Sequence, residues 1–327
     1  MKRSRTRRVA FIFASAVVAA SLFAAGARAQ VGSALIARPW QPGQTVNATN
    51  FFLGTPTDSE TVGDETNLAR GVSFGRFRLD PNDPQGLTVG WLYDQLEIDS
   101  TDPLLPERLN QTAVALGKNL GEVWDGWNVS IAGGFGFAGD LPYADGDAVF
   151  GLGSIVATKQ LDQRTALTVL LDFDGSRSVL PDVPLPGVSY SVFVSPTLRY
   201  ALGVPFSTLF WKPDDRWTID ITYALPIGGR AEAEYRFDDN LFAFVAYNAS
   251  TRGYTLNDTP GNRRIFFEQN RAEAGLRLRP NPDVTWIASV GWAFGQEFTT
   301  GFDTIDDDSL RDLDDAAFLR VGLNFNF

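Results

Sequence analysis

The chain has 327 residues, 28 Lys and Arg against 39 Asp and Glu, a formal net charge of −11, no cysteine and no histidine. The missing residue types exclude disulfides, thiolate metal sites, Ser-His-Asp hydrolysis and histidine acid–base chemistry. An acidic chain also lacks the clustered cations that nucleic-acid binding needs. We therefore expect no cofactor, no metal site, no nucleic-acid partner and no enzymatic activity.

The first residues are typical of a secretory signal. Residues 2–8 form a basic head, residues 9–25 are apolar, and Ala27-Arg28-Ala29 has the small-x-small form of a cleavage site. The apolar run is short for a spanning helix, which needs ~20 apolar residues. We predict a signal peptide over residues 1–29, cleaved after Ala29 and exported by the general secretory route. A retained amino-terminal anchor is the alternative.

The segment after the signal gives a weaker pattern. Residues 30–66 are polar and show no sustained alternation of apolar and polar positions. They are predicted to form a mobile periplasmic extension, with a plug inside the lumen as the alternative. The folded domain is expected over residues 67–327.

Alternating apolar and polar residues predict antiparallel β-strands through the rest of the chain. One face of these strands is apolar and the other carries Arg and Glu, as in a barrel with a wet lumen and a lipid-facing exterior. A soluble secreted β-protein with inverted faces has the same periodicity and stays open. The clearest stretches are residues 127–137, 167–174, 217–225, 229–237, 269–279, 284–294 and 319–327.

Connection lengths predict the topology. Residues 162–163, 213–215, 238–240 and 280–283 form tight turns, whereas residues 175–187, 251–264 and 299–315 are longer and polar. Short periplasmic turns alternating with longer outer loops are the rule for transmembrane barrels. Strand candidates begin near Leu87 or Trp127. The expected fold is therefore all-β, an antiparallel up-and-down transmembrane β-barrel of 12 to 14 strands.

The last strand carries a recognisable pattern. Its apolar residues alternate with polar ones, and Gly322, Phe325 and Phe327 match the spacing of an insertion signal. This strand resembles the targeting strand of bacterial outer-membrane β-barrel proteins, although Val321 stands where a polar residue is usual. The Asp-Asp turns also resemble those of a porin-like outer-membrane family. The resemblance implies location in the outer membrane, with lipid, lipopolysaccharide and the barrel-insertion machinery as partners.

Charged residues on the polar strand faces are the candidate functional residues. They either set an electric field for permeating solutes or pair across strands and close the lumen. The candidates for lumen charge and selectivity are Asp220, Arg230, Glu232, Glu234, Arg236, Arg271, Glu273, Arg277 and Arg279.

Two further features have simpler explanations than a binding site. An acidic loop has oxygen ligands suited to Ca²⁺ or to bridging lipopolysaccharide, but its spacing fits no calcium-loop template and favours a solvated loop. Its residues are Asp303, Asp306, Asp307, Asp308, Asp312, Asp314 and Asp315. Aromatic residues at strand ends could stack on sugars, but they are typical of interfacial girdles. These are Trp211, Trp217, Tyr223, Tyr235, Trp286 and Trp292.

The sequence thus predicts an exported outer-membrane barrel that passes small solutes passively, like a porin. The alternative within this fold is a non-conducting barrel that acts as a structural element or surface receptor. Composition and periodicity do not distinguish the two, because both need the same wall.

Overall fold

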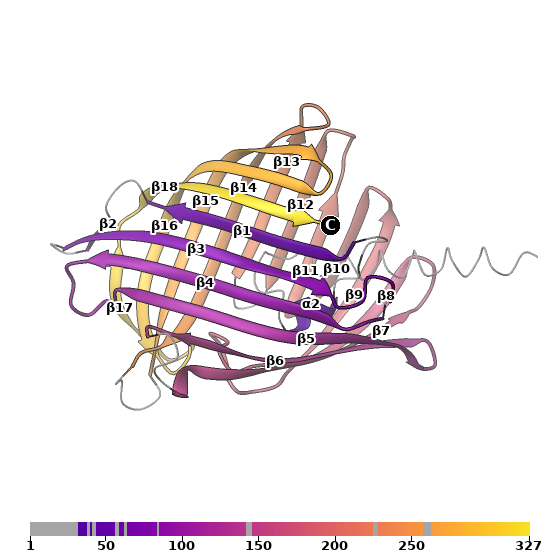
Figure 1. The fold of residues 1–327 in the computed structure, drawn as a ribbon, viewed down its shortest axis with the longest axis horizontal. Coiled ribbons are helices and arrows are strands. Elements are labelled where there is room, and N and C mark those ends of the chain that lie inside the picture. The colour runs from indigo at the N-terminus through magenta and orange to yellow at the C-terminus, as the bar shows by residue number, and fades with distance from the viewer. Residues whose placement is uncertain are drawn as a thin grey trace, which may run out of the picture.

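The computed structural model describes residues 32–37, 40, 44–55, 59–61, 64–83, 85–141, 146–224, 228–257 and 263–327. Its strands form one antiparallel sheet that closes on itself (Figure 1). A short helix, α2 (Ser33–Ala37), and a 3₁₀ turn, η1 (Gly146–Ala148), accompany the sheet. The strands are β1 (Val46–Gly54), β2 (Ser59–Thr61), β3 (Asp64–Arg78), β4 (Thr88–Ser100), β5 (Arg108–Trp124), β6 (Trp127–Gly139), β7 (Val149–Gln160), β8 (Thr165–Asp174), β9 (Leu185–Ser195), β10 (Leu198–Val204), β11 (Phe206–Trp211), β12 (Trp217–Ala224), β13 (Gly228–Arg236), β14 (Leu241–Thr255), β15 (Arg264–Asn281), β16 (Val284–Gly301), β17 (Asp307–Leu313) and β18 (Ala316–Asn326).

The barrel has 16 strands, and the expectation of 12 to 14 was wrong. β17 and β18 both pair with β16 and together make one interrupted strand of the wall. β2 pairs with residues 64–66 at the start of β3, whereas β1 pairs with residues 69–77 of the same strand. The ring closes where β1 pairs with β18 on one side and with β3 on the other.

The barrel begins earlier in the chain than residue 67, the expected boundary. Val46–Gly54, expected to belong to a polar extension, forms β1 and supplies the closing strand. Its alternation is weak because Asn and Thr face the lumen beside Phe51 and Leu53, so neither face is uniformly apolar. The predicted signal peptide, residues 1–29, lies outside the described residues.

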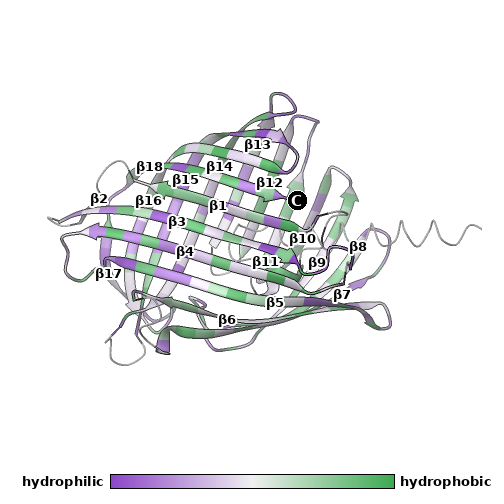
Figure 2. Cartoon of the chain, in the orientation of Figure 1, coloured by the Kyte–Doolittle hydropathy of each residue, from purple (hydrophilic) through white to green (hydrophobic). Residues whose placement is uncertain are grey.

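The two faces of the wall have the predicted polarity. Outward-facing residues are exposed and apolar, with Val290 59%, Val321 57% and Val245 57% exposed. Charged residues between them, such as Arg277 at 8%, are shielded on the inner face. Figure 2 shows hydrophobic and hydrophilic positions alternating along the strands. The predicted orientation, with apolar residues outward and Arg and Glu inward, is confirmed.

Tight turns cluster at the end of the barrel that holds Val46 and Phe327, which we call the terminus end. Asp162 accepts hydrogen bonds from the backbone N–H groups of Arg164 (2.7 Å) and Thr165 (2.9 Å). Asp238 does the same for Asn240 and Leu241, both at 2.8 Å. Side chains of this kind replace the missing backbone partners of a tight turn. The short connections predicted at these positions are confirmed.

Strand length varies strongly around the ring. β10, β11, β12 and β13 have 7, 6, 8 and 9 residues. β14, β15 and β16 have 15, 18 and 18 residues. The wall is therefore low on the β10–β13 side and tall on the β14–β16 side. Two predicted outer loops are partly strand: residues 251–255 belong to β14, and residues 299–301 and 307–313 belong to β16 and β17.

Candidate functional site

The nine predicted lumen residues all lie on strands β12, β13 and β15, at positions that alternate with the outward-facing residues of each strand. Asp220 projects from β12 between Ile219 and Ile221, and it faces Glu232 of β13 in the sheet register. The strands thus bring most of the predicted residues together on one part of the inner wall. Arg236 is the exception, because it is exposed at the terminus end, where it lies 3.8 Å from Asp239.

Five of these residues form a connected ion-pair cluster, the wall network: Arg230, Glu232, Glu234, Arg277 and Arg279. Arg277 donates to both oxygens of Glu232, at 2.6 and 2.7 Å, and also to Glu234. Arg279 donates to Glu234 at 2.9 Å, and Arg230 donates to Glu232. A bidentate Arg–carboxylate pair fixes both groups in orientation.

Two phenylalanines hold the arginines of this network along the wall. β14 lies between β13 and β15, and its Phe244 and Phe242 rings face inward. The Arg277 guanidinium lies 4.3 Å from the Phe244 ring centroid and Arg279 lies 3.9 Å from that of Phe242. The arginines therefore reach over one strand to the glutamates of the next. Pairing of this kind follows the wall and does not span the lumen.

A second pair lies beside the wall network. Arg320 of β18 donates to both oxygens of Glu273, at 2.8 and 3.0 Å, and Ser289 donates to Glu273 at 2.7 Å. Arg320 is not among the predicted lumen residues, although it lies on the polar face of the last strand.

A third cluster crosses the barrel and was missed by sequence reasoning. Asp94 of β4 is 1% exposed and accepts two hydrogen bonds of 2.8 Å from Arg70 of β3. Arg252 of β14 pairs with the same carboxylate. We call Arg70, Asp94 and Arg252 the crossing cluster, because β14 stands across the lumen from β3 and β4. It was missed because Arg252 was expected in a loop and Arg70 before any recognised strand.

On the side of the crossing cluster that faces away from the terminus end, the inner wall becomes apolar. Strands from opposite sides meet here, where Thr255 of β14 pairs with Gly139 of β6. Buried apolar side chains fill the space between the tall strands and β3–β5, so this part of the opposite end is closed. This apolar core includes Leu68, Leu96, Ile98, Leu109, Tyr254, Ile265, Phe267, Phe298 and Leu313.

The start of the described chain lies inside the barrel (Figure 1). α2 packs against β4, β5, β6 and β7. Leu35 is 1% exposed, and its carbonyl accepts a hydrogen bond from Arg76 at 3.2 Å. Trp40 donates to Thr88 at 3.1 Å, and its ring lies 4.1 Å from the Arg76 guanidinium. These residues lie against the inner side of the wall. Among the described residues, no helix is long and apolar enough to cross a membrane.

The connection between β8 and β9 covers the opposite end. Arg264 of β15 donates to the carbonyls of Arg177 (2.8 Å) and Ser176 (2.6 Å). The backbone N–H of Thr304, between β16 and β17, donates to the Ser178 carbonyl at 2.9 Å. These bonds attach the connection to the tall side of the barrel.

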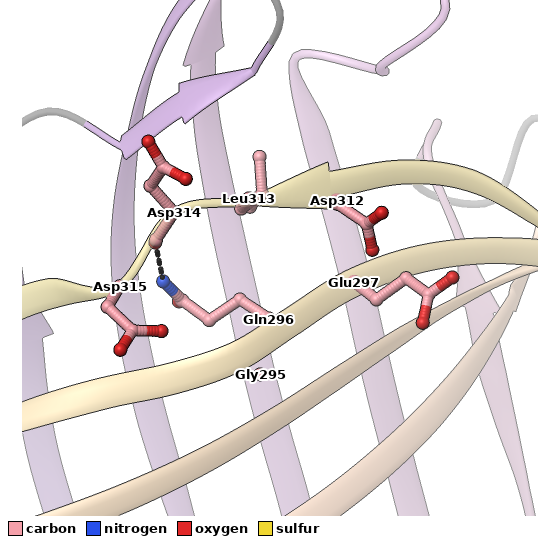
Figure 3. Close-up of a pocket in the computed structure, with 7 residues that line it drawn as sticks. All are labelled: Gly295, Gln296, Glu297, Asp312, Leu313, Asp314 and Asp315. Atoms are coloured by element: carbon pink, nitrogen blue, oxygen red, sulfur yellow. Dashed lines mark hydrogen bonds between the residues drawn. The ribbon is translucent and has the colours of Figure 1, made fainter.

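The acidic loop has structural partners rather than a metal-binding arrangement. Asp303 accepts hydrogen bonds from the backbone N–H groups of Leu180 and Ile305. A pocket of about 500 Å³ lies where β17 passes into β18 (Figure 3). In it, Gln296 donates to the Asp314 carbonyl at 2.9 Å. In the part of the chain that the structure describes, no group of three acidic residues is arranged to hold a metal ion.

The predicted aromatic residues lie on the outer face, where a membrane girdle would place them. Trp286, Trp292 and Tyr223 are 55%, 49% and 51% exposed. Trp217 and Tyr235, near the terminus end, contact each other edge to face with ring centroids 5.0 Å apart. Their outward orientation removes them from any site within the lumen.

The sequence matches no protein-family model and no curated protein. Solved structures similar to this chain include TodX, the toluene transporter of Pseudomonas putida, at 10% identity and a TM-score of 0.38, covering 86% of this chain and 90% of that one. The CymD monoaromatic hydrocarbon channel is 9% identical with a TM-score of 0.34, covering 88% and 89%. The NanC porin is 9% identical with a TM-score of 0.29, covering 86% and 100%.

Similarities this distant carry no argument about solutes, so the class follows from the wall itself. A closed antiparallel barrel with an apolar exterior and a charged interior is the architecture of an outer-membrane β-barrel protein. The class predicted from the last strand is confirmed.

Proposed function

We propose that this protein is a passive, porin-like channel for small solutes in the outer membrane. The observation that supports it is the charged inner wall, whose principal ion pairs run along β13–β15 and leave the lumen uncrossed there. Charged groups that line a lumen tune the passage of solutes.

The inner face of β9 and of the adjoining low side is polar, which supports a polar lumen beside the apolar core. Here small hydroxyl side chains replace large apolar ones, notably Ser189 and Ser191 of β9 and Thr222 of β12. Within the described residues, these three hydroxyl oxygens have no hydrogen-bond partner.

The test is conductance of the folded protein in planar lipid bilayers. We expect discrete channel events from protein that migrates as a folded barrel, and none from the same protein kept unfolded in urea. Folded, inserted protein without events would contradict the channel and support the second candidate, a non-conducting barrel. The apolar core and the crossing cluster favour that second candidate, because they close part of the lumen.

We further propose export by the general secretory route, cleavage after Ala29 and insertion guided by Gly322, Phe325 and Phe327. The rings of Phe325 and Phe327 stack with centroids 5.8 Å apart, at the end of β18. Sequencing of the amino terminus of outer-membrane protein should begin at Gln30. A mature chain that still contains residues 1–29 would contradict cleavage.

A further inference from the structure

The inner wall carries an excess of positive charge, although the whole chain has a net charge of −11. Arginines outnumber carboxylates in the ion-pair clusters, so three of the carboxylates each pair with two arginines. Arg70 and Arg252 share Asp94 in the crossing cluster. In the wall network, Glu232 pairs with Arg230 and Arg277, and Glu234 pairs with Arg277 and Arg279.

Among the residues that the structure describes, Arg271 of β15 has no carboxylate partner in this arrangement. The nearest acid along its strand is Glu273, whose two oxygens are occupied by Arg320 and Ser289. Among the described residues, the one hydrogen bond that Arg271 donates is a long one of 3.5 Å, to Asn248. Its Nη1 is buried and has no hydrogen-bond partner among the described residues.

The electrostatic surroundings of Arg271 are also positive. It interacts with Arg70, Arg320 and Arg230 as like charges, against one carboxylate, Glu273. The guanidinium groups of Arg70, Arg230 and Arg320 each have a carboxylate partner. Arg271 is the member of this group that lacks one among the described residues. A buried charge without a partner is costly, and a bound counterion removes that cost.

A guanidinium presents its N–H donors in a planar fork that fits the two oxygens of an oxyanion. We propose that the lumen is anion-selective, and that Arg271 binds the carboxylate or phosphate group of a passing solute with Arg70, Arg230 and Arg320 as the surrounding positive charges. This inference rests on the proposed channel function and names its substrate class.

Selectivity is measured as the reversal potential across a bilayer with a KCl gradient. We expect the wild type to pass Cl⁻ in preference to K⁺. Arg271→Gln should lower the anion-to-cation permeability ratio by about threefold or more, since it removes one charge from inside the pore. The matched control is Lys118→Gln, which removes one exposed charge from the outer face of β5 and should leave the ratio unchanged.

Binding is measured separately, on the folded barrel in detergent. Sodium acetate and sodium phosphate are each compared with sodium chloride at equal ionic strength, and the melting temperature is the readout. Either oxyanion should raise the melting temperature of the wild type. Arg271→Lys keeps the charge but loses the fork, so it should lose this shift while retaining anion preference.

The outcomes separate the two proposals. A conducting but cation-selective wild type would overturn the anion site and leave the channel standing. A barrel without conductance that still gains stability from acetate or phosphate through Arg271 would overturn the channel and leave the site. No stabilisation by either salt would overturn the site. If Arg271→Gln fails to fold, Arg271→Lys against the wild type decides the binding test.

Discussion

The crossing cluster gives the sharpest prediction about stability. Asp94→Asn keeps the size of the side chain but removes the charge that Arg70 and Arg252 share. The side chains of Arg70 and Asp94 are 5% and 1% exposed, so solvent cannot replace the lost carboxylate. Removing one partner of a buried ion pair costs about 3–5 kcal/mol. Asparagine can still accept one hydrogen bond, which places the expected loss near the lower limit, at about 3 kcal/mol.

The measurement is unfolding by urea of barrels in lipid vesicles, followed by tryptophan fluorescence. Asp99→Asn is the matched control, because Asp99 lies on the exposed face of the same strand. Its effect should stay within about 0.5 kcal/mol. A loss below about 1 kcal/mol for Asp94→Asn would refute the view that this cluster ties β14 to β3 and β4.

A double-mutant cycle adds an internal check. Arg252→Met alone removes one of the two arginines and should also destabilise the barrel. In the Asp94→Asn background the same change removes an uncompensated buried charge, so the two effects should be non-additive by about 1 kcal/mol or more. Additive effects would show that Arg252 and Asp94 do not interact energetically.

Three other predictions test the outer face of the wall, the stacking of Arg277 on Phe244, and the ion pair between Asp102 and Arg311. Val290→Arg places a charge on the outer face of β16. If this position faces the middle of the bilayer, the free energy of unfolding in vesicles should fall by about 2–4 kcal/mol, and an unchanged value would contradict that placement. Phe244→Ala should cost about 3 kcal/mol by urea titration, because the ring is buried and supports Arg277; a loss below about 1 kcal/mol would show that the ring is not packed. Burial raises the pKa of Asp102, but a backbone N–H donor and the Arg311 guanidinium outweigh this and hold the pKa below its ordinary value of 3.8. The stabilisation from this pair is therefore present above pH 3.8 and lost as the pH falls through the lowered pKa. Protection of the β4–β5 loop from hydrogen exchange, expressed relative to the intrinsic rate at each pH, should fall as the pH drops below 3.8, and unchanged protection would contradict the pairing.

The sequence predicts the carboxyl-terminal strands well, because there the two faces meet different surroundings. In β13 the polar residues face the lumen and the small or aromatic ones face lipid, so the alternation of residues 229–237 is plain. β15 follows the same rule through residues 269–279. The lumen candidates were found for this reason.

Prediction fails where the inner face is itself apolar. On β4, Leu92, Leu96 and Ile98 face inward, whereas Glu97 and Asp99 face outward. The polarity of the faces is thus reversed beyond the crossing cluster, and a rule that assigns charge to the lumen cannot identify these strands. Without them, the partners of Arg252 could not be found, and the strand count came out too low.

The unequal height of the wall has a consequence for the surrounding lipid. At about 3.3 Å per residue, the 6 residues of β11 extend only about 20 Å along the strand. The apolar band of a bacterial outer-membrane barrel is about 25 Å tall, and strand tilt reduces the height that β11 covers. Acyl chains next to β10–β13 must therefore shorten or tilt, whereas beside β15 the wall is taller than the hydrocarbon layer is thick. The protein should sit in a wedge of uneven bilayer thickness, with its thinnest lipid annulus at the low side.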